Sequence, residues 1–178
     1  MVERIELPDC EKGLGHVILD PASGHLIAGV RIEVISLWPD DRGCFLEIGR
    51  MGTGLTKDFP AGSTQISAAL SYPGTIKAFH YHLHQTDCWV PAIGMLQVAL
   101  VDLRPGSETF GKRNTMYVGS LRPWRIHIPP GVGHGYKVLG AEPAMLVYIT
   151  DRFYNRDDEG RIEYCDPSIN YNWETQHK

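Results

Sequence analysis

Short segments rich in apolar residues recur along the chain from residue 31 onward, and several of them alternate between apolar and polar positions. β-Branched and aromatic residues are frequent in these segments, a composition typical of β-strands. The pattern predicts strands at residues 31–37, 44–48, 64–70, 76–82, 88–93, 95–103, 115–119, 124–129, 135–139 and 144–150.

The connections between these segments carry the residues that tight turns require. "YPGT", "PPGVGHG" and "LGAEP" are examples, and the chain holds 19 glycines and 12 prolines. Many short strands joined by short loops predict an all-β double-sheet jelly roll or a small barrel. We expect one domain over residues 1–178, in which the less regular residues 1–30 form an N-terminal arm.

Charge and composition exclude several partners. The formal net charge is −4 and no run of lysine or arginine is present, so a surface for nucleic acid or an anionic membrane is not expected. The N-terminus carries early acids and no apolar stretch, unlike a signal peptide, and no window approaches the ~18 apolar residues of a membrane helix. Four cysteines without a C-x-x-C pair favour a reduced, cytoplasmic protein.

The segment "KAFHYHLHQTD" (77–87) concentrates histidine. Residues i and i+2 of a strand point to the same side, so His80 and His82 project together, and His84 joins them if the strand continues. Two imidazoles on one strand face form half of a metal site, which needs further ligands from neighbouring strands.

The spacing of these residues resembles the metal motifs of the cupin superfamily. Glycines and candidate ligands follow the first motif: Gly74, His80, His82, Asp87 and Gly94. Cupins usually have the longer glutamate where Asp87 stands. "PPGVGH" ends at His134 and resembles the second motif. The resemblance implies a shell of two nitrogens from one strand, one oxygen and a third nitrogen around Fe, Mn, Ni, Co or Zn: His80, His82, Asp87 and His134.

Residues 31–173 are also similar to one cupin branch, the dTDP-4-dehydrorhamnose 3,5-epimerases. The similarity rests on "PDDRGCFLE", "VALVDLRPGSETFG", "IPPGVGHGYKVL", "YITDRFY" and "EGRIEYCDPSINYNW", which occur in family order. It implies a cupin jelly roll, a small-molecule substrate, and a homodimer that exchanges N-terminal strands between subunits.

The same resemblance implies a metal-free acid–base reaction. A histidine base removes a proton beside the 4-keto group, a tyrosine returns one on the opposite side, and a lysine stabilises the enolate. The base falls on His80 and the acid on Tyr148. Gln65 and His134 match further polar residues of the family's cavity.

The chain departs from the family at several of these positions. Lys77 replaces the arginine that holds the nucleotide phosphates, and a lysine is only a point charge. His82 replaces a glutamine, and Asp87 aligns with the enolate-stabilising lysine. The C-terminal segment that supplies an aspartate partner to the base is missing. Because His82 and Asp87 stand where cupins have metal ligands, these two changes favour a bound divalent metal.

Three other residues are candidates for contact with a substrate. Arg125 and His127 share one strand face, with cavity and surface both open for His127, and Trp89 is expected to line the cavity. If His80 binds metal it cannot also be the base, so His84 becomes the alternative base or fourth ligand.

The leading hypothesis is a metal-binding isomerase or epimerase that acts on a 4-keto deoxysugar or sugar nucleotide through an enediolate. Alternatives are a metal-dependent lyase, dehydratase or Fe(II) oxygenase on another small molecule, a non-catalytic protein that binds a small ligand, and the metal-free epimerase itself.

Overall fold

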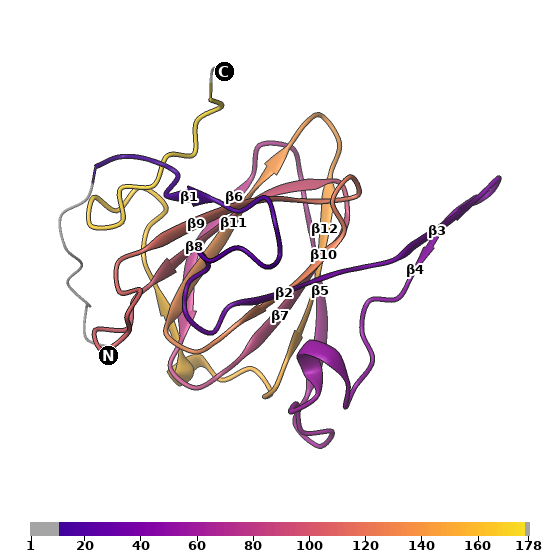
Figure 1. Cartoon of the computed structure of the whole chain (residues 1–178), viewed down its shortest axis with the longest axis horizontal. Coiled ribbons are helices and arrows are strands. Elements are labelled where there is room, and N and C mark those ends of the chain that lie inside the picture. Colours follow the sequence, from indigo (N-terminus) through magenta and orange to yellow (C-terminus); the bar gives the residue numbers. More distant parts are fainter. Residues whose placement is uncertain (1–10, 177–178) are drawn as a thin grey trace.

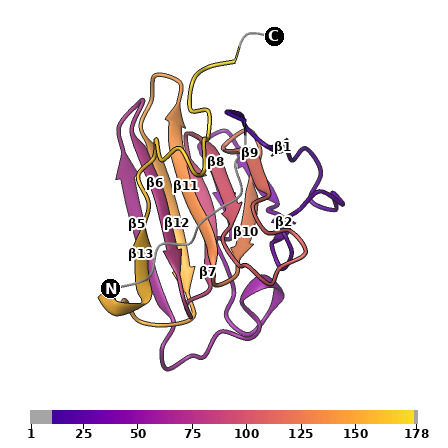
Figure 2. The ribbon, with the colours of Figure 1, turned by 90° about the vertical axis from the view of Figure 1, so that its left-hand side faces the viewer.

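The computed structural model describes residues 11–176, which form two β-sheets facing each other (Figure 1 and Figure 2). The six-stranded sheet has the order β1 (His16–Val17), β9 (Arg113–Gly119), β8 (Met95–Asp102), β11 (Val132–Leu139), β6 (Ile76–His82) and β13 (Glu159–Arg161). The five-stranded sheet has the order β2 (Arg31–Val34), β10 (Trp124–Ile128), β7 (Asp87–Ile93), β12 (Ala144–Thr150) and β5 (Gln65–Ser71). The predicted all-β jelly roll is confirmed.

A two-stranded hairpin stands apart from both sheets. It consists of β3 (Leu37–Asp40) and β4 (Gly43–Leu46), and Figure 1 shows it extending well beyond the body of the molecule. The 3₁₀ turns η1 (Gly54–Thr56) and η2 (Arg156–Asp158) are the helical elements of the described chain. Within residues 11–176 no helix is long and apolar enough to cross a membrane.

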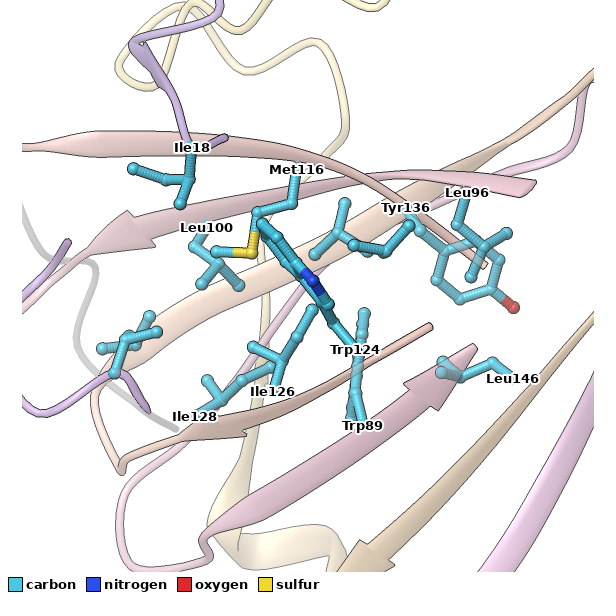
Figure 3. Packing of buried hydrophobic residues seen from close by; sticks show 14 of the residues in the cluster. Ile18, Trp89, Leu96, Leu100, Met116, Trp124, Ile126, Ile128, Tyr136 and Leu146 are labelled. Atoms are coloured by element: carbon cyan, nitrogen blue, oxygen red, sulfur yellow. The ribbon is translucent and has the colours of Figure 1, made fainter. Parts of the chain in front are cut away.

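The main core lies between the two sheets and follows from strand alternation. On β10, Trp124, Ile126 and Ile128 are at most 4% exposed, whereas the residues between them face the other way. Figure 3 shows Trp124 of the five-stranded sheet directed toward Met116 of the other, in the same cluster as Trp89 and Leu100. A second apolar cluster forms where C-terminal residues such as Trp173 cover the outer side of β6, which contributes Phe79.

Strands β6 and β12 have the predicted bounds, and the longer strands agree with prediction to within a few residues. The predicted arm is described from residue 11 onward; there β1 pairs in parallel with β9 at the edge of the sheet, while residues 1–10 lie outside the described part. Strand β3 was not predicted, and neither were β1 and β13, because two or three residues are too short to show alternation.

Candidate active site

A cavity of about 420 Å³ lies between the two sheets. Both sheets contribute polar side chains to its lining, and a cavity with convergent polar groups is the usual form of a small-molecule site. The lining residues include Lys77, His80, His82, His134 and Tyr136 from the six-stranded sheet and Gln65, Asp87, Trp89, Leu146 and Tyr148 from the five-stranded sheet.

His80 has a carboxylate partner. Its Nδ1 atom lies 2.7 Å from Oε1 of Glu159, and the Nε atom of Arg161 donates to the same oxygen at 2.8 Å. Strand β13 brings these side chains to His80 because it pairs antiparallel with β6, with Arg161 opposite His80. Gly160 allows the close approach, since a Cβ atom there would lie 2.0 Å from the Tyr81 ring.

The electrostatics of this pair favour a neutral imidazole beside an ionised carboxylate. Burial lowers the pKa of His80 below its ordinary value; Glu159 opposes the shift and Arg161 adds to it. Burial alone would raise the pKa of Glu159, but the hydrogen bond from Arg161 and the charges of His80 and Arg161 lower it. A neutral histidine held by a carboxylate is suited to accept a proton near neutral pH.

The sequence led us to expect that the C-terminal segment with an aspartate partner for the base is missing, and the structure provides a glutamate partner in its stead. Glu159 takes that place from a three-residue strand instead of from a longer C-terminus. The sequence offered one usable signal, an acid and an arginine flanking Gly160 in the quoted "EGRIEY" segment, but nothing in it reported pairing with β6.

Three of the four predicted metal ligands converge. One ligand atom from each of His82, Asp87 and His134 lies within 4.8 Å of the other two. The carboxylate of Asp87 is 3.9 Å from His82 Nε2 and 3.7 Å from His134 Nε2. Asp87 and His134 are each 4% exposed, so this cluster is an interior feature.

Hydrogen bonds fix the cluster. Asp87 accepts from the side-chain amide of Gln85 at 2.7 Å and from the indole of Trp89 at 3.0 Å. His134 Nδ1 lies 3.0 Å from the carbonyl oxygen of Val132. Burial lowers the pKa of His134 to about 4, with Asp87 opposing the shift, so His134 is neutral at physiological pH.

The structure does not place His80 in this group, so its prediction as a fourth ligand was wrong. His80 faces His134 across β6 and β11, but its Nδ1 atom is bonded to Glu159. This removes the conflict between metal ligand and base that the sequence posed for His80.

Three further predicted residues lie away from the cavity. Strand β6 ends at His82, so His84 is not carried onto the same face; its side chain is exposed and its backbone N–H donates to Asp158. On β10, Arg125 and His127 point away from the core; Arg125 bonds Glu33 and the carbonyls of Glu47 and Ile48. The prediction of His84 as a base is corrected because β6 ends before it, and that of Arg125 and His127 as substrate contacts because Trp124, Ile126 and Ile128 take the inward positions of β10.

The wall opposite His80 contains Tyr148. It lies on β12, directly beside Trp89 of β7 and Ser67 of β5, and lines the cavity from the five-stranded sheet. Trp89 is a wall residue, as expected, with its ring 5.0 Å from that of His134. A histidine and a tyrosine thus face one cavity from opposite sheets.

Cations line the same cavity. Lys77 is exposed, and the side chain of Arg161 is 71% exposed while it holds Glu159. Gln65 lies nearby, and its side-chain oxygen accepts from the backbone N–H of Tyr154. Positive charge beside a polar cavity is suited to an anionic ligand.

The fold is a cupin-type jelly roll, and the site is a polar cavity between its two sheets. Residues 25–178 match the family model described as dTDP-4-dehydrorhamnose 3,5-epimerase, and the chain belongs to this family. Its members are enzymes named for epimerisation, and this chain is an enzyme of that class.

Individual proteins agree with this assignment. The chain is 43% identical over 155 residues to the spore coat polysaccharide biosynthesis protein SpsL of Bacillus subtilis, covering 86% of this chain and 100% of the relative. It is 33% identical to the probable low-salt glycan biosynthesis epimerase Agl13 of Haloferax volcanii, covering 84% and 96%. The crystal structure of RmlC from Legionella pneumophila, in complex with dTDP-4-keto-L-rhamnose, superposes with a TM-score of 0.70 at 26% identity, covering 81% and 78%.

Proposed function

We propose that this enzyme epimerises a nucleotide-linked 4-keto-6-deoxysugar through an enediolate. The observation that carries the proposal is the His80–Glu159 pair on one wall of a cavity whose opposite wall holds Tyr148. The family name and the sugar nucleotide bound to the Legionella relative support this class of substrate.

The proposed reaction consists of two proton transfers. Neutral His80 removes the proton from a carbon next to the 4-keto group, and the electron pair of the broken C–H bond moves toward the carbonyl oxygen. Glu159 holds the imidazole and stabilises the imidazolium that forms. Tyr148 then gives its proton to the opposite face of the same carbon, which inverts that centre. Exchange with solvent restores both groups.

Substrate binding is assigned to the charged side of the cavity. Lys77 and Arg161 supply positive charge for a diphosphate, while Gln65 and Trp89 contribute a polar group and a flat wall. Lys77 binds as a point charge, without the two parallel hydrogen bonds that an arginine gives.

We also propose a homodimer formed through the β3–β4 hairpin. Trp38 and Phe45 on this hairpin are 53% and 66% exposed, although their rings contact each other at 5.6 Å. Strand β5 ends the five-stranded sheet and exposes Ile66 and Leu70 on its outer side. A hairpin from a second protomer lying on such a face would bury both apolar sets.

A cytoplasmic location remains a proposal from the cysteine pattern.

The reaction is tested by incubating the protein with dTDP-4-keto-6-deoxyglucose and determining the sugar configuration by NMR. The proposal predicts inversion beside the keto group in the wild type. It predicts a loss of about 10²–10⁴-fold in His80→Gln, the usual contribution of a positioned base. No inversion in the wild type across a panel of nucleotide-linked 4-keto sugars would reject it.

The two proton transfers need no metal ion, so metal dependence is not part of this proposal. The negative charge that develops on the keto oxygen is the part of the reaction that His80 and Tyr148 leave uncompensated.

A further inference from the structure

We propose that His82, Asp87 and His134 bind one divalent transition-metal ion in the wall of the cavity, through two imidazole Nε2 atoms and one carboxylate. The site adjoins the His80–Glu159 pair but shares no residue with it.

The first argument is that hydrogen-bond acceptors face one another. His134 donates Nδ1–H to the carbonyl of Val132, so its Nε2 atom carries a lone pair. That lone pair lies 3.7 Å from an oxygen of Asp87, too far for a direct hydrogen bond. A cation between the two atoms satisfies both. An imidazole whose other nitrogen is fixed by a backbone carbonyl is also the usual arrangement of a metal-ligating histidine.

His82 contributes a second lone pair in the same place. Its Nε2 atom lies 3.2 Å from the Gln85 amide nitrogen, which also donates to Asp87. With the amide as donor, Nε2 of His82 is the acceptor. The N–H groups of the Gln85 amide thus stand between two acceptors, His82 and Asp87, where a cation would bind. A bound metal ion would displace this amide.

The second argument is the buried charge. The side chain of Asp87 is 5% exposed, and its two hydrogen bonds come from neutral donors, Gln85 and Trp89. A carboxylate held away from water by neutral partners is costly, and a divalent ion compensates it more completely than an amide does.

The distances allow binding after a small adjustment. The three ligand atoms now lie within 4.8 Å of one another, and metal–ligand bonds of about 2.0–2.2 Å require them to come closer together. His82 retains some freedom, since its side chain is 11% exposed, whereas Asp87 and His134 are more deeply buried. We expect His82 to move toward the other two ligands.

The donor set defines the class of ion. Two imidazoles and one carboxylate suit Fe(II), Mn(II), Co(II), Ni(II) or Zn(II), and three protein ligands leave positions open toward the cavity. If the proposed epimerase reaction is correct, an ion here would compensate the charge on the keto oxygen, the role that the sequence leaves without a lysine.

The test is direct binding of Co(II) to the full-length protein after chelator treatment, followed by calorimetry and by visible absorption, without any sugar. The proposal predicts one equivalent per chain and a ligand-field spectrum. Asp87→Asn and His82→Gln should each weaken binding by at least about tenfold, the loss that even an outer partner causes. Circular dichroism confirms folding, and His82→Gln, at a partly exposed position, covers the case in which Asp87→Asn does not fold.

Two control variants separate this site from surface histidines. His16 and His25 are exposed and their rings stack at 4.4 Å, so they are a rival site; His84 is a further exposed histidine. His25→Gln and His84→Gln should bind Co(II) as the wild type does. Absence of binding, or binding lost in His25→Gln and retained in His82→Gln, would overturn the proposal. Because no sugar is present, failure here leaves the epimerase assay to judge the proposed function separately.

Discussion

His80 and Glu159 are joined by a 2.7 Å contact between Nδ1 and Oε1, across the antiparallel pairing of β6 with β13. The three-residue strand at the edge of the sheet therefore supplies the partner of the proposed base. Glu159 is best described as a positioning residue, because it acts through His80.

Glu159→Gln should change the pH profile as well as the rate. The charge of Glu159 raises the pKa of His80 against the effect of burial, so its loss lowers that pKa further. A base must be neutral, so kcat/KM falls at acid pH as His80 takes up a proton. The wild type should show this fall below the ordinary pKa of histidine, and the variant should show it at a still lower pH. The rate should fall by about 10- to 100-fold, part of what a positioned base contributes. Arg161 lowers the same pKa, and Arg161→Gln should move the fall the other way; shifts of one sign in both variants would contradict this assignment.

Tyr148→Phe should separate proton removal from inversion. Without a donor on the opposite face, His80 can only return a proton to the face from which it took one. In D₂O the variant should exchange the substrate proton and keep the original configuration. NMR reports exchange and configuration in one spectrum. Full inversion by Tyr148→Phe would remove this tyrosine from the mechanism.

Lys77→Ala should weaken binding of the nucleotide substrate. Loss of one exposed charged contact predicts a KM increase of about tenfold with little change in kcat. A 4-keto sugar without phosphates should show no such effect. Lys57→Ala, at an exposed lysine that does not line the cavity, is the matched control. An equal KM change in both lysine variants would indicate general electrostatics rather than a binding contact.

Serine at Trp38 and Phe45 together should convert the proposed dimer into monomers. The hairpin makes no sheet with the rest of the described chain, so its apolar side chains gain burial only from a partner. Light scattering after size exclusion measures the mass. Leu121→Ser, at a leucine that is 87% exposed elsewhere, should leave the mass unchanged. A monomeric wild type would refute the dimer.

Asp102→Asn should destabilise the fold. Burial would raise the pKa of Asp102, but hydrogen bonds from Arg104, Ser107 and Thr109 lower it to about 2. The stabilisation that these hydrogen bonds give to ionised Asp102 is therefore fully present above the unfolded-state pKa of about 3.9 and is lost as the pH falls toward 2. Urea unfolding at pH 7 should show a loss of about 2–4 kcal/mol.

The exposed pair Asp40–Arg42 has the same spacing, and Asp40→Asn should change stability little. Equal effects in the two asparagine variants would contradict the role of burial at Asp102.

Most of the fold could be read from the sequence because its longer strands show alternation or apolar runs. Strand β6 was predicted with its observed bounds, and the convergence of His82 with Asp87 and His134 was implied by the resemblance to the cupin metal motifs. Strand β13 could not be predicted in this way, since three residues carry no period.

The misplaced and missed site residues have different causes. His84 failed as a cavity residue because β6 stops at His82. Arg125 and His127 failed because the apolar residues of β10 took the inward positions. Glu159 was missed because its relation to His80 is a contact between distant parts of the chain.

The central claim is that His80 removes a proton beside a keto group. Incubation with dTDP-4-keto-6-deoxyglucose in D₂O, followed by mass spectrometry, measures this step alone. Deuterium should enter the sugar ring with the wild type and not with His80→Gln, whereas His84→Gln should behave as the wild type. Equal deuterium uptake by His80→Gln and the wild type, or none by either, would contradict the claim.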